Sequence, residues 1–332
     1  MKKIRVAING FGRIGRLVLR AALESGRKDL VFVAVNDLAP AEQNAYLLEY
    51  DSVHGKLPMD VKLDGDYILV GNQKIKCLSE RDPSRLPWAK MKIDIVMECT
   101  GLFTSADKAR VHLDCGAKRV LVSAPSNGAD KTIVYGVNEK TLNKKDKIIS
   151  NASCTTNCLA PVLNVLDKKF GVKNGWMTTV HAYTGDQQLL DKNHKDFRRA
   201  RAANLSMIPT STGAAKAIGL VLPKLAGKMD GIAIRVPTPD VSVIELVLNM
   251  SKKVKPETVN ATMRAAASNI LAYNDKPLVS KDFTTDAHSA IFDASQTKVV
   301  DGNVLHVTAW YDNEWGFSNR MCDTAVVIGQ KL

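Results

Sequence analysis

The chain of 332 residues contains no run of about 18 apolar residues, the length that a membrane-spanning helix needs. Its first residues, Met1-Lys2-Lys3, look like the basic end of a secretion signal. The apolar run that follows contains Arg5 and stops at Asn9-Gly10, so no apolar signal core develops. Internal repeats and low-complexity linkers are also lacking. We therefore expect neither a membrane segment nor a secretion signal.

Cysteines and aromatic residues are few. The six cysteines are scattered from Cys77 to Cys322, which excludes a disulfide scaffold, and we expect reduced thiols in the cytoplasm. The net charge of +12 can attract polyanions. Single-stranded nucleic-acid sites, however, interleave cations with aromatic side chains, and aromatic residues make up only 6% of this chain. We expect no specific nucleic-acid partner, and a polyanion-binding scaffold protein stays a distant alternative.

The first half of the chain alternates short apolar runs with helical patterns. Such alternation predicts a Rossmann-type, doubly wound parallel α/β sheet. The strand-like runs are Lys3–Asn9, Leu30–Asn36, Ile93–Glu98, Arg119–Ser123, Thr132–Val137 and Lys147–Ser150, and the helical segments are Ile14–Ser25 and Ala106–Cys115.

The second half has longer strand-like stretches and predicts an α+β domain with a mostly antiparallel sheet. The expected strands are Trp176–His181, Gly231–Val236, Ser242–Met250 and Val304–Tyr311, with helices over Thr155–Phe170 and Pro256–Ser268. Helical spacing over Ser318–Gln330 suggests a last helix that packs back onto the first domain. We therefore expect a first domain over 1–152, completed by a helix at about 314–332, and a catalytic domain over 153–313.

The glycine-rich segment Gly10-Phe11-Gly12-Arg13-Ile14-Gly15 directly follows a strand pattern and opens a helix pattern, as a dinucleotide site requires. Gly10 allows a tight turn, Gly12 lets a pyrophosphate approach the backbone, and Gly15 allows close packing of helix and strand. Asp37 ends the second strand, 22 residues beyond Gly15, where its carboxylate can bind an adenosine ribose. Its charge repels a 2′-phosphate and so favours NAD over NADP.

Cys154 is the candidate nucleophile. Ser153 is a plausible helix N-cap, which places Cys154 in the first helical turn, where the helix dipole and free N–H groups lower a thiol pKa. The same N–H groups could hold an oxyanion beside the sulfur. Cys158 lies one turn further on, but two cysteines alone do not make a zinc site, so we expect no metal.

His181 ends a strand-like run, and a cysteine with a histidine gives a nucleophile and a proton acceptor. A dinucleotide site supplies a hydride acceptor. Together these predict an aldehyde oxidation in which a hemithioacetal on Cys154 becomes a thioester. Water, phosphate or another nucleophile could then release the acyl group.

Six motifs in this order resemble those of the phosphorylating glyceraldehyde-3-phosphate dehydrogenase family, over essentially the whole chain. They are Ile8–Arg16, Ser150–Cys158, His181–Thr184, Thr212–Lys216, Arg235–Thr238 and Trp310–Glu314. The resemblance implies a homotetramer that converts D-glyceraldehyde 3-phosphate, NAD and inorganic phosphate to 1,3-bisphosphoglycerate. It also implies that Cys154 is the nucleophile and His181 the base.

The resemblance further assigns the binding residues. Thr184 and Arg235 correspond to the site for the substrate phosphate. Ser153, Thr155, Arg199, Thr212 and Gly213 correspond to the site for the attacking phosphate, although Arg201 lies close enough to be confused with Arg199. The cofactor residues that it implies, in addition to the three glycines, are Arg13, Ile14, Asp37, Arg81, Ser123 and Asn313.

Two alternatives stay open beside this interpretation. Many NAD-specific members of the family carry Leu-Pro where this chain has Lys192-Asn193, and a lysine there could tolerate a 2′-phosphate, so NADP is expected as a poorer cofactor. Erythrose-4-phosphate dehydrogenases share the scaffold but tend to have Glu in place of Asp37. In that branch, water rather than phosphate would release the acyl group.

Overall fold

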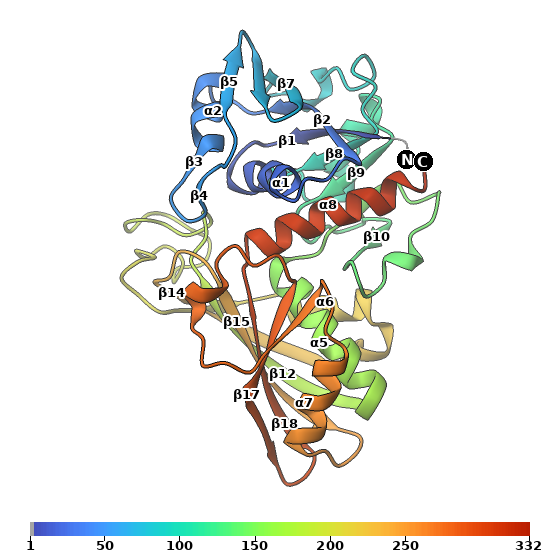
Figure 1. The fold of residues 1–332 in the computed structure, drawn as a ribbon, viewed down its shortest axis with the longest axis vertical. Helices are drawn as coiled ribbons and strands as arrows, with labels where there is room; N and C mark the ends of the chain where they lie inside the picture. The colour runs from blue at the N-terminus through green and yellow to red at the C-terminus, as the bar shows by residue number, and fades with distance from the viewer. Residues whose placement is uncertain (1–2) are drawn as a thin grey trace. The chain divides into compact units, whose positions relative to one another are not determined.

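The structure is a computed structural model that describes residues 3–332, and in it the chain divides into two compact units. Unit 1 contains the residues up to Ser153 together with Ser318–Leu332, and unit 2 is Cys154–Phe317. Each unit is built around one large β-sheet (Figure 1). Among the described residues, no helix combines the length and the hydropathy that crossing a bilayer requires.

The sheet of unit 1 is mostly parallel, in the strand order β10-β11-β9-β8-β1-β2-β7-β6-β5. From β1 the chain moves to β2 on one side and later returns to β8 on the other side, so the winding reverses at β1. This is the doubly wound arrangement that the sequence predicts, and ligands bind at such reversal points. The strands are β1 (Ile4–Asn9), β2 (Leu30–Asn36), β5 (Val61–Asp64), β6 (Tyr67–Val70), β7 (Gln73–Leu78), β8 (Ile95–Glu98), β9 (Arg119–Val122), β10 (Lys131–Thr132) and β11 (Ile148–Ser150), with a separate pair β3 (Tyr50–Asp51) and β4 (Gly55–Lys56).

The strands of unit 1 are apolar because helices cover them. Val6, Ile8 and Val96 are fully buried, as expected for a parallel sheet with both faces covered. The helices are α1 (Arg13–Glu24), α2 (Ala41–Glu49), α3 (Ala106–Ala109), α4 (Val111–Asp114) and α8 (Trp315–Gly329). In α8, the buried Cys322 lies 3.5 Å from the Val18 carbonyl oxygen of α1, so the C-terminal residues belong to the core of this unit.

Unit 2 contains a mixed, mostly antiparallel sheet in the order β13-β14-β12-β15-β18-β17-β16, as the sequence predicts. Only the pairs β12–β14 and β16–β17 are parallel. The strands are β12 (Val172–Ala182), β13 (Ile208–Ser211), β14 (Met229–Val236), β15 (Ser242–Met250), β16 (Leu271–Asn274), β17 (Ala290–Val300) and β18 (Val304–Tyr311). The helices are α5 (Cys154–Phe170), α6 (Ala214–Val221) and α7 (Pro256–Ala265), and the short 3-10 helices of the chain are Pro83–Arg85, Glu139–Thr141, Pro223–Leu225 and Ser280–Phe283.

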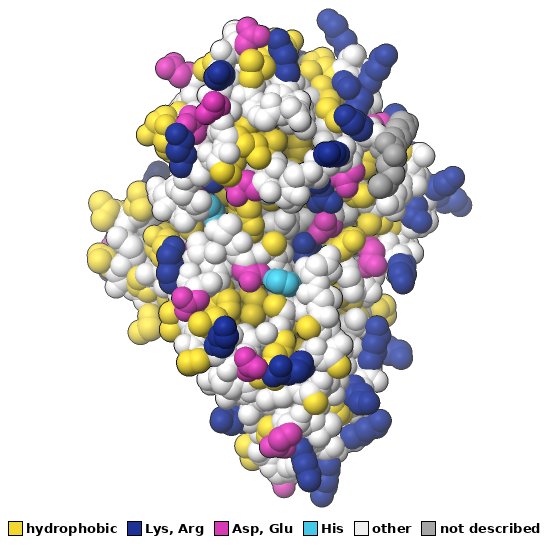
Figure 2. Space-filling view, in the orientation of Figure 1, with side chains coloured by type: hydrophobic (Ala, Val, Ile, Leu, Met, Phe, Trp, Pro, Cys, Tyr) yellow, Lys and Arg dark blue, Asp and Glu magenta, His cyan; other side chains and the backbone are white. Residues whose placement is uncertain are grey.

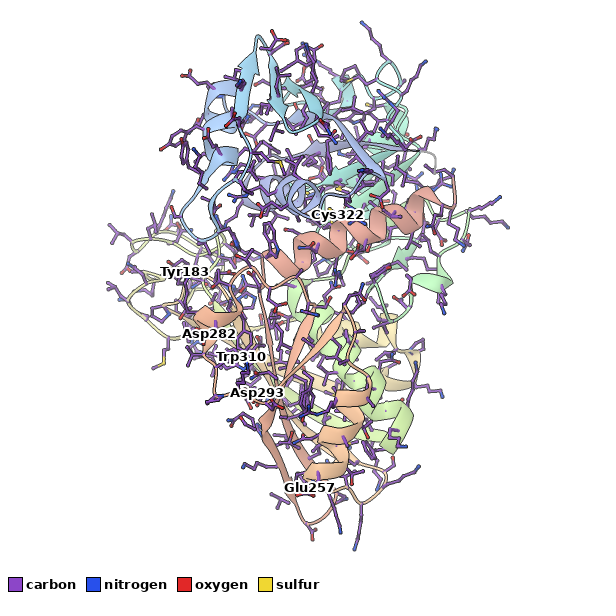
Figure 3. All side chains as sticks on the ribbon, viewed as in Figure 1. Tyr183, Glu257, Asp282, Asp293, Trp310 and Cys322 are labelled. Carbon is purple, nitrogen blue, oxygen red and sulfur yellow. The ribbon has the colours of Figure 1, made fainter. Side chains whose placement is uncertain are left out.

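Helices α5, α6 and α7 pack on one face of this sheet (Figure 1). The other face carries half-exposed apolar side chains, namely Trp176, Val247 and Ile232, of which the first two are cross-strand partners. Between two inner strands of this sheet, Trp310 of β18 donates its indole N–H to Asp293 of β17, at 3.0 Å (Figure 3). A cross-strand polar pair of this kind fixes the register of the two strands.

Several expected elements differ from the structure. The strand expected over Thr132–Val137 is too long: β10 is only Lys131–Thr132, and the buried Ile133 and Val134 lie between it and the turn that begins at Tyr135. The single helix expected over Ala106–Cys115 is divided at Arg110 into α3 and α4. Strands β13, β16 and β17 were not expected at all.

Candidate active site

Cys154 is the first residue of α5, and a strained backbone position lies two residues before it. Ala152 has φ +57°, in the left-handed region that residues with a Cβ avoid at a cost of about 1 kcal/mol. This conformation turns the chain sharply between β11 and α5. The thiol is therefore held at a helix N-terminus, as expected.

The sheet of unit 2 brings His181 to this thiol. His181 is near the end of β12, and its Nε2 lies 3.5 Å from Cys154 Sγ. The neighbouring strand β14 runs parallel to β12 with His181 opposite Arg235, which places a guanidinium beside the ring. Strand register thus assembles three of the predicted site residues from distant parts of the chain.

The hydrogen bonds of His181 determine its tautomer. Nδ1 lies 2.6 Å from the Ala182 carbonyl oxygen, which can only accept, and 3.2 Å from Arg235 NH1, which can only donate. Because the carbonyl contact is the shorter one, and Arg235 NH1 can donate to that same carbonyl instead, we assign the proton to Nδ1. Nε2 therefore presents a lone pair to the thiol of Cys154. Arg235 NH1 bonds to the same carbonyl at 3.2 Å and to Thr184 Oγ1 at 3.3 Å, so the guanidinium is fixed next to the ring.

The resting pair is held in its neutral form. Burial raises the pKa of the Cys154 thiol, and Arg235 and Thr155 oppose this shift only in part. Burial, together with the charge of Arg235, lowers the pKa of His181 to about 3. The direction for the thiol is opposite to the one expected from a helix N-terminus, because the effect of burial on the pKa outweighs that of the helix dipole.

The two candidate arginines differ in their surroundings. Its charge contributes to lowering the pKa of His181, whereas Arg201 pairs at the surface with Asp191, at 2.9 Å. Arg199 is mostly buried and bonds to Asp186 at 2.6 Å and to Thr210 Oγ1 at 3.0 Å. These contacts fix the planar guanidinium in one orientation.

The other residues expected at the phosphate sites lie at two helix starts. Gly213 immediately precedes α6, and Thr212 Oγ1 accepts the Ala214 N–H at 3.2 Å. Ser153 immediately precedes α5. Thr155 is buried, and its hydroxyl lies 2.9 Å from Tyr311 Oη.

Two residues that the sequence analysis did not single out complete the support around Cys154. The buried Tyr311 hydroxyl also lies 2.9 Å from Thr179 Oγ1, and its ring meets His181 edge-on with centroids 5.9 Å apart. Burial raises the pKa of the Tyr311 phenol, which stays protonated. Only strand register brings these side chains together, so no local motif could have revealed them.

Asn313 is connected through Ser242 to Ala182, the last residue of β12. Ser242 Oγ accepts the Ala182 N–H at 3.0 Å and donates to Asn313 Oδ1 at 2.8 Å. The preceding Val241 has φ +66°, a rare conformation for a β-branched residue. These contacts fix which way the Asn313 amide points, with its NH₂ group turned away from Ser242.

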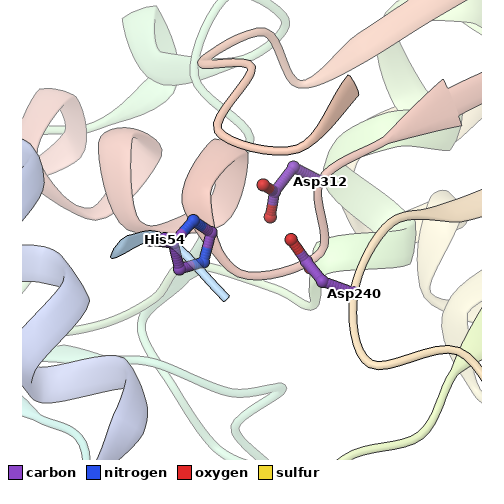
Figure 4. Close-up of side chains that lie close together, drawn as sticks. All are labelled: His54, Asp240 and Asp312. Carbon is purple, nitrogen blue, oxygen red and sulfur yellow. The ribbon is translucent and has the colours of Figure 1, made fainter. Parts of the chain in front are cut away.

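The carboxyl groups of Asp240 and Asp312 face each other near Asn313 (Figure 4), with oxygens within 4.8 Å. Asp312 accepts the N–H groups of Thr285, Glu314 and Trp315 at 2.6–2.9 Å. Burial and the charge of Asp312 raise the pKa of Asp240 to about 8. Asp240 is therefore protonated at neutral pH.

In unit 1, the glycine loop follows β1 at the point where the winding reverses. Gly10 has φ +88°, and a Cβ there would lie 2.5 Å from the Thr100 nitrogen. A Cβ on Gly15 would lie 2.2 Å from the Gly10 oxygen, whereas a Cβ on Gly12 would meet nothing within 4 Å. The loop therefore requires two glycines for its own packing and leaves open space at the third, as a bound pyrophosphate requires.

Asp37 is tied to the glycine loop. Its carboxylate accepts the Phe11 N–H at 2.8 Å and the Ala39 N–H at 3.0 Å. Arg13, in the first turn of α1, pairs with Asp51 at 2.9 Å. The other predicted cofactor residues of this unit are the half-buried Ile14, the exposed Arg81, and Ser123 directly after β9.

The basic surface does not form a single stripe on the face shown in Figure 2. Lys and Arg side chains lie at many points of that face, with Asp and Glu between them.

Comparison with known proteins gives the same family over nearly the whole chain. The model for the glyceraldehyde 3-phosphate dehydrogenase NAD binding domain matches residues 4–106, and the model for the C-terminal domain of the same family matches residues 153–313. The chain is 58% identical over 333 residues to the glyceraldehyde-3-phosphate dehydrogenase of Cereibacter sphaeroides, covering 99% of both chains. It is 58% identical over 331 residues to the enzyme of that name from Xanthobacter flavus, with coverage of 98% and 99%. The identity to the one from Zymomonas mobilis is 53% over 335 residues, with 99% of both chains covered.

Proposed function

Since the chain belongs to the glyceraldehyde-3-phosphate dehydrogenase family, we propose that it oxidises and phosphorylates D-glyceraldehyde 3-phosphate through covalent catalysis by Cys154. Its activity is that of an NAD-dependent glyceraldehyde-3-phosphate dehydrogenase of glycolysis. The observation that carries the mechanism is the contact of 3.5 Å between Cys154 Sγ and the unprotonated Nε2 of His181.

In the first step, Sγ forms a bond to the aldehyde carbon and the thiol proton passes to His181 Nε2. The imidazolium then donates that proton to the carbonyl oxygen, which completes the hemithioacetal. In the oxidation, Nε2 takes the hydroxyl proton back as hydride leaves the same carbon, and a thioester remains. Attack by inorganic phosphate on the thioester carbon breaks the C–S bond and releases 1,3-bisphosphoglycerate. The leaving sulfur takes the proton held on Nε2, which regenerates the thiol of Cys154 and the neutral imidazole of His181.

The residues of unit 1 fit NAD, because the glycine loop leaves space at Gly12 and places Asp37 beside it. In unit 1, the residues that would hold the cofactor are Gly10, Gly12, Gly15, Arg13, Ile14, Asp37, Arg81 and Ser123. Asn313 of unit 2 is assigned to the cofactor by the family resemblance alone. When bound, NAD supplies the acceptor for the hydride. The carboxylate of Asp37 disfavours a 2′-phosphate, so NADP should be the poorer cofactor, with Lys192 as the residue that could tolerate it.

Two anionic groups need two sets of fixed donors. We assign the substrate phosphate to Thr184 and Arg235, which are already hydrogen-bonded to each other. We assign inorganic phosphate to Arg199 and to the two helix starts, with Ser153, Thr155, Thr212 and Gly213. Helix N-termini and arginine forks are both suited to phosphate.

The surface of unit 2 supports a homotetramer. One face of its sheet is not covered by helices and carries Trp176, which is 47% exposed. The loop after β12 exposes Leu189, Leu190 and Phe197 almost fully. Exposed apolar area of this extent on two surfaces is typical of faces that pack against other copies. Light scattering after size-exclusion chromatography tests this assembly.

All six cysteines are free thiols, as expected for a protein that functions in the reducing environment of the cytoplasm.

The deciding experiment follows NADH formation from glyceraldehyde 3-phosphate and NAD, with and without inorganic phosphate. Cys154→Ser is the control that lacks the nucleophile. Turnover that requires phosphate and is lost in Cys154→Ser supports the proposal. Erythrose 4-phosphate and NADP are assayed in parallel. Turnover that is indifferent to phosphate would mean that water releases the acyl group, and it would favour the erythrose 4-phosphate activity instead.

A further inference from the structure

Three parallel strands of unit 1 end on buried polar side chains that lie side by side. Asn9 ends β1, Asn36 ends β2 and Glu98 ends β8, and the strand register pairs Asn9 with both of the others. All three are at most 6% exposed. The residue after each of them begins a loop at the edge of the sheet where a dinucleotide binds.

These side chains form a continuous hydrogen-bonded chain. Asn36 Nδ2 donates to Asn9 Oδ1 at 2.8 Å, and Asn9 Nδ2 donates to Glu98 Oε2 at 2.7 Å. Asn36 Oδ1 accepts the Glu80 N–H at 2.8 Å. Reversing either amide would bring two donors or two acceptors together, so each orientation is determined.

His112 of α4 supplies another donor to Glu98. Trp88 Nε1 lies 3.2 Å from His112 Nδ1, and an indole N–H can only donate, so Nδ1 carries no proton. The proton is on Nε2, which lies 2.9 Å from Glu98 Oε2. On the other carboxylate oxygen, Glu98 accepts the N–H of Thr100 at 2.8 Å and also the Thr100 hydroxyl.

Glu98 is therefore a buried carboxylate with four donors, none of which belongs to a lysine or an arginine. A buried charge without a cationic partner is costly, so an apolar residue would fill this space more cheaply. Unlike an apolar side chain, the carboxylate forms directional hydrogen bonds to three segments of the chain, through Asn9, Thr100 and His112. Through Thr100 it also reaches the glycine loop, because only the absence of a Cβ on Gly10 leaves room for the Thr100 backbone.

We propose that Glu98 and His112 are positioning residues for NAD, because their hydrogen bonds hold the starts of the three cofactor loops, at Gly10, Asp37 and Cys99, in fixed relative positions. This inference rests on the proposed use of NAD by unit 1. In this proposal, neither Glu98 nor His112 contacts the cofactor.

The first variant is Glu98→Gln, which keeps the size of the side chain. Its NH₂ group would face a donor in either orientation, namely Thr100 on one side or Asn9 and His112 on the other. We expect the Kd for NAD, measured by calorimetry, to rise about tenfold or more because the loops lose their alignment. The kcat at saturating NAD should stay within about threefold of wild type, because Cys154 and His181 are untouched.

ADP-ribose serves as a second probe, because it carries the adenosine and pyrophosphate of NAD but not the nicotinamide. Its affinity should fall by the same factor as that for NAD, since the three loops bind this shared part. His112→Leu should weaken both ligands in the same way. His112→Gln, which keeps an N–H donor for Glu98, should fall between wild type and His112→Leu.

Asn138→Ala is the matched control for lost stability. Asn138 is buried in the same unit and forms two hydrogen bonds, with Val134 N at 2.8 Å and with Thr132 O at 2.9 Å, away from the three loops. It should lower Tm and leave both affinities unchanged.

The proposal is overturned if Glu98→Gln and His112→Leu lower Tm as the control does but bind NAD and ADP-ribose within twofold of wild type. If Glu98→Gln does not fold, the affinities of His112→Leu and His112→Gln for NAD and ADP-ribose test the proposal by the same criterion. Wild-type protein that binds ADP-ribose but does not reduce NAD would argue against the proposed function while leaving this inference in place. Wild-type protein that binds neither ligand would overturn both.

Discussion

The carbonyl oxygen of Ala182 lies 2.6 Å from Nδ1 of the adjacent His181, and this contact determines which nitrogen faces Cys154. The tautomer is set by the backbone of the strand itself, so it does not depend on a carboxylate partner. The imidazole is thus prepared to accept the thiol proton before substrate arrives.

We expect His181→Asn to keep the donor to Ala182 and lose the acceptor to Cys154. The kcat should fall by about 10²- to 10⁴-fold, the contribution typical of general acid–base catalysis, with little change in Tm. Steady-state kinetics and thermal unfolding measure the two effects. A loss of kcat below tenfold would argue against His181 as the base.

The two neighbouring arginines should behave differently. We expect Arg199→Ala to raise the KM for inorganic phosphate by about tenfold or more, because a fixed guanidinium is removed from the site. Arg201→Ala removes only an exposed ion pair, and it should leave the KM within about twofold. If the two effects were reversed, the assignment of the phosphate site would be wrong.

Two substitutions in the glycine loop should have different effects, one on NAD binding and the other on stability. Gly12→Ala should leave Tm nearly unchanged, since its Cβ meets no protein atom within 4 Å, but it should raise the Kd for NAD by blocking the approach of the pyrophosphate. Gly15→Ala should lower Tm, because its Cβ would lie 2.2 Å from the Gly10 oxygen. Calorimetry and thermal unfolding distinguish the two. Unchanged NAD binding in Gly12→Ala would contradict the predicted cofactor position.

Stability should fall as pH rises between about 4 and 8 because of Asp240. Its pKa is about 8 in the folded chain and 3.8 in a free side chain, so in this window the folded state keeps a proton that the unfolded state releases. Asp240→Asn cannot lose a proton and keeps a donor toward Asp312. We expect it to be more stable than wild type by about 1 kcal/mol or more at pH 8, with the difference vanishing near pH 4. Urea unfolding at the two pH values checks this, and equal stabilities at pH 8 would refute it.

The sequence was most informative where one short segment both determines the local backbone structure and contains the functional residues. The turn Gly10–Gly15 follows a strand and opens a helix, and Cys154 begins a helix, so both could be placed from local patterns. Arg199 could not be separated from Arg201 by spacing, because the difference lies in the burial of the two arginine side chains: Arg199 is 18% exposed and bonds to Thr210, whereas Arg201 is 67% exposed.

Contacts set by strand register were not predictable. Tyr311 reaches Thr155 and Thr179 only because β18 and β12 both pair with β15. The strand expected over Thr132–Val137 failed for a related reason. Ile133 and Val134 are apolar and buried, yet they lie outside any strand, and a short apolar run does not distinguish a buried strand from other buried backbone.

Unit 1 is built from both ends of the chain, and this has a consequence for synthesis. Its last helical residues, which include Asp323 bonded to Arg27 at 3.1 Å, leave the ribosome only after the whole of unit 2. At 5–20 residues per second, the intervening residues 154–317 delay completion by roughly 10–30 s. A nascent chain, or one ended by a premature stop codon before Ser318, therefore lacks part of the cofactor-binding unit. Only full-length translation yields a complete dehydrogenase.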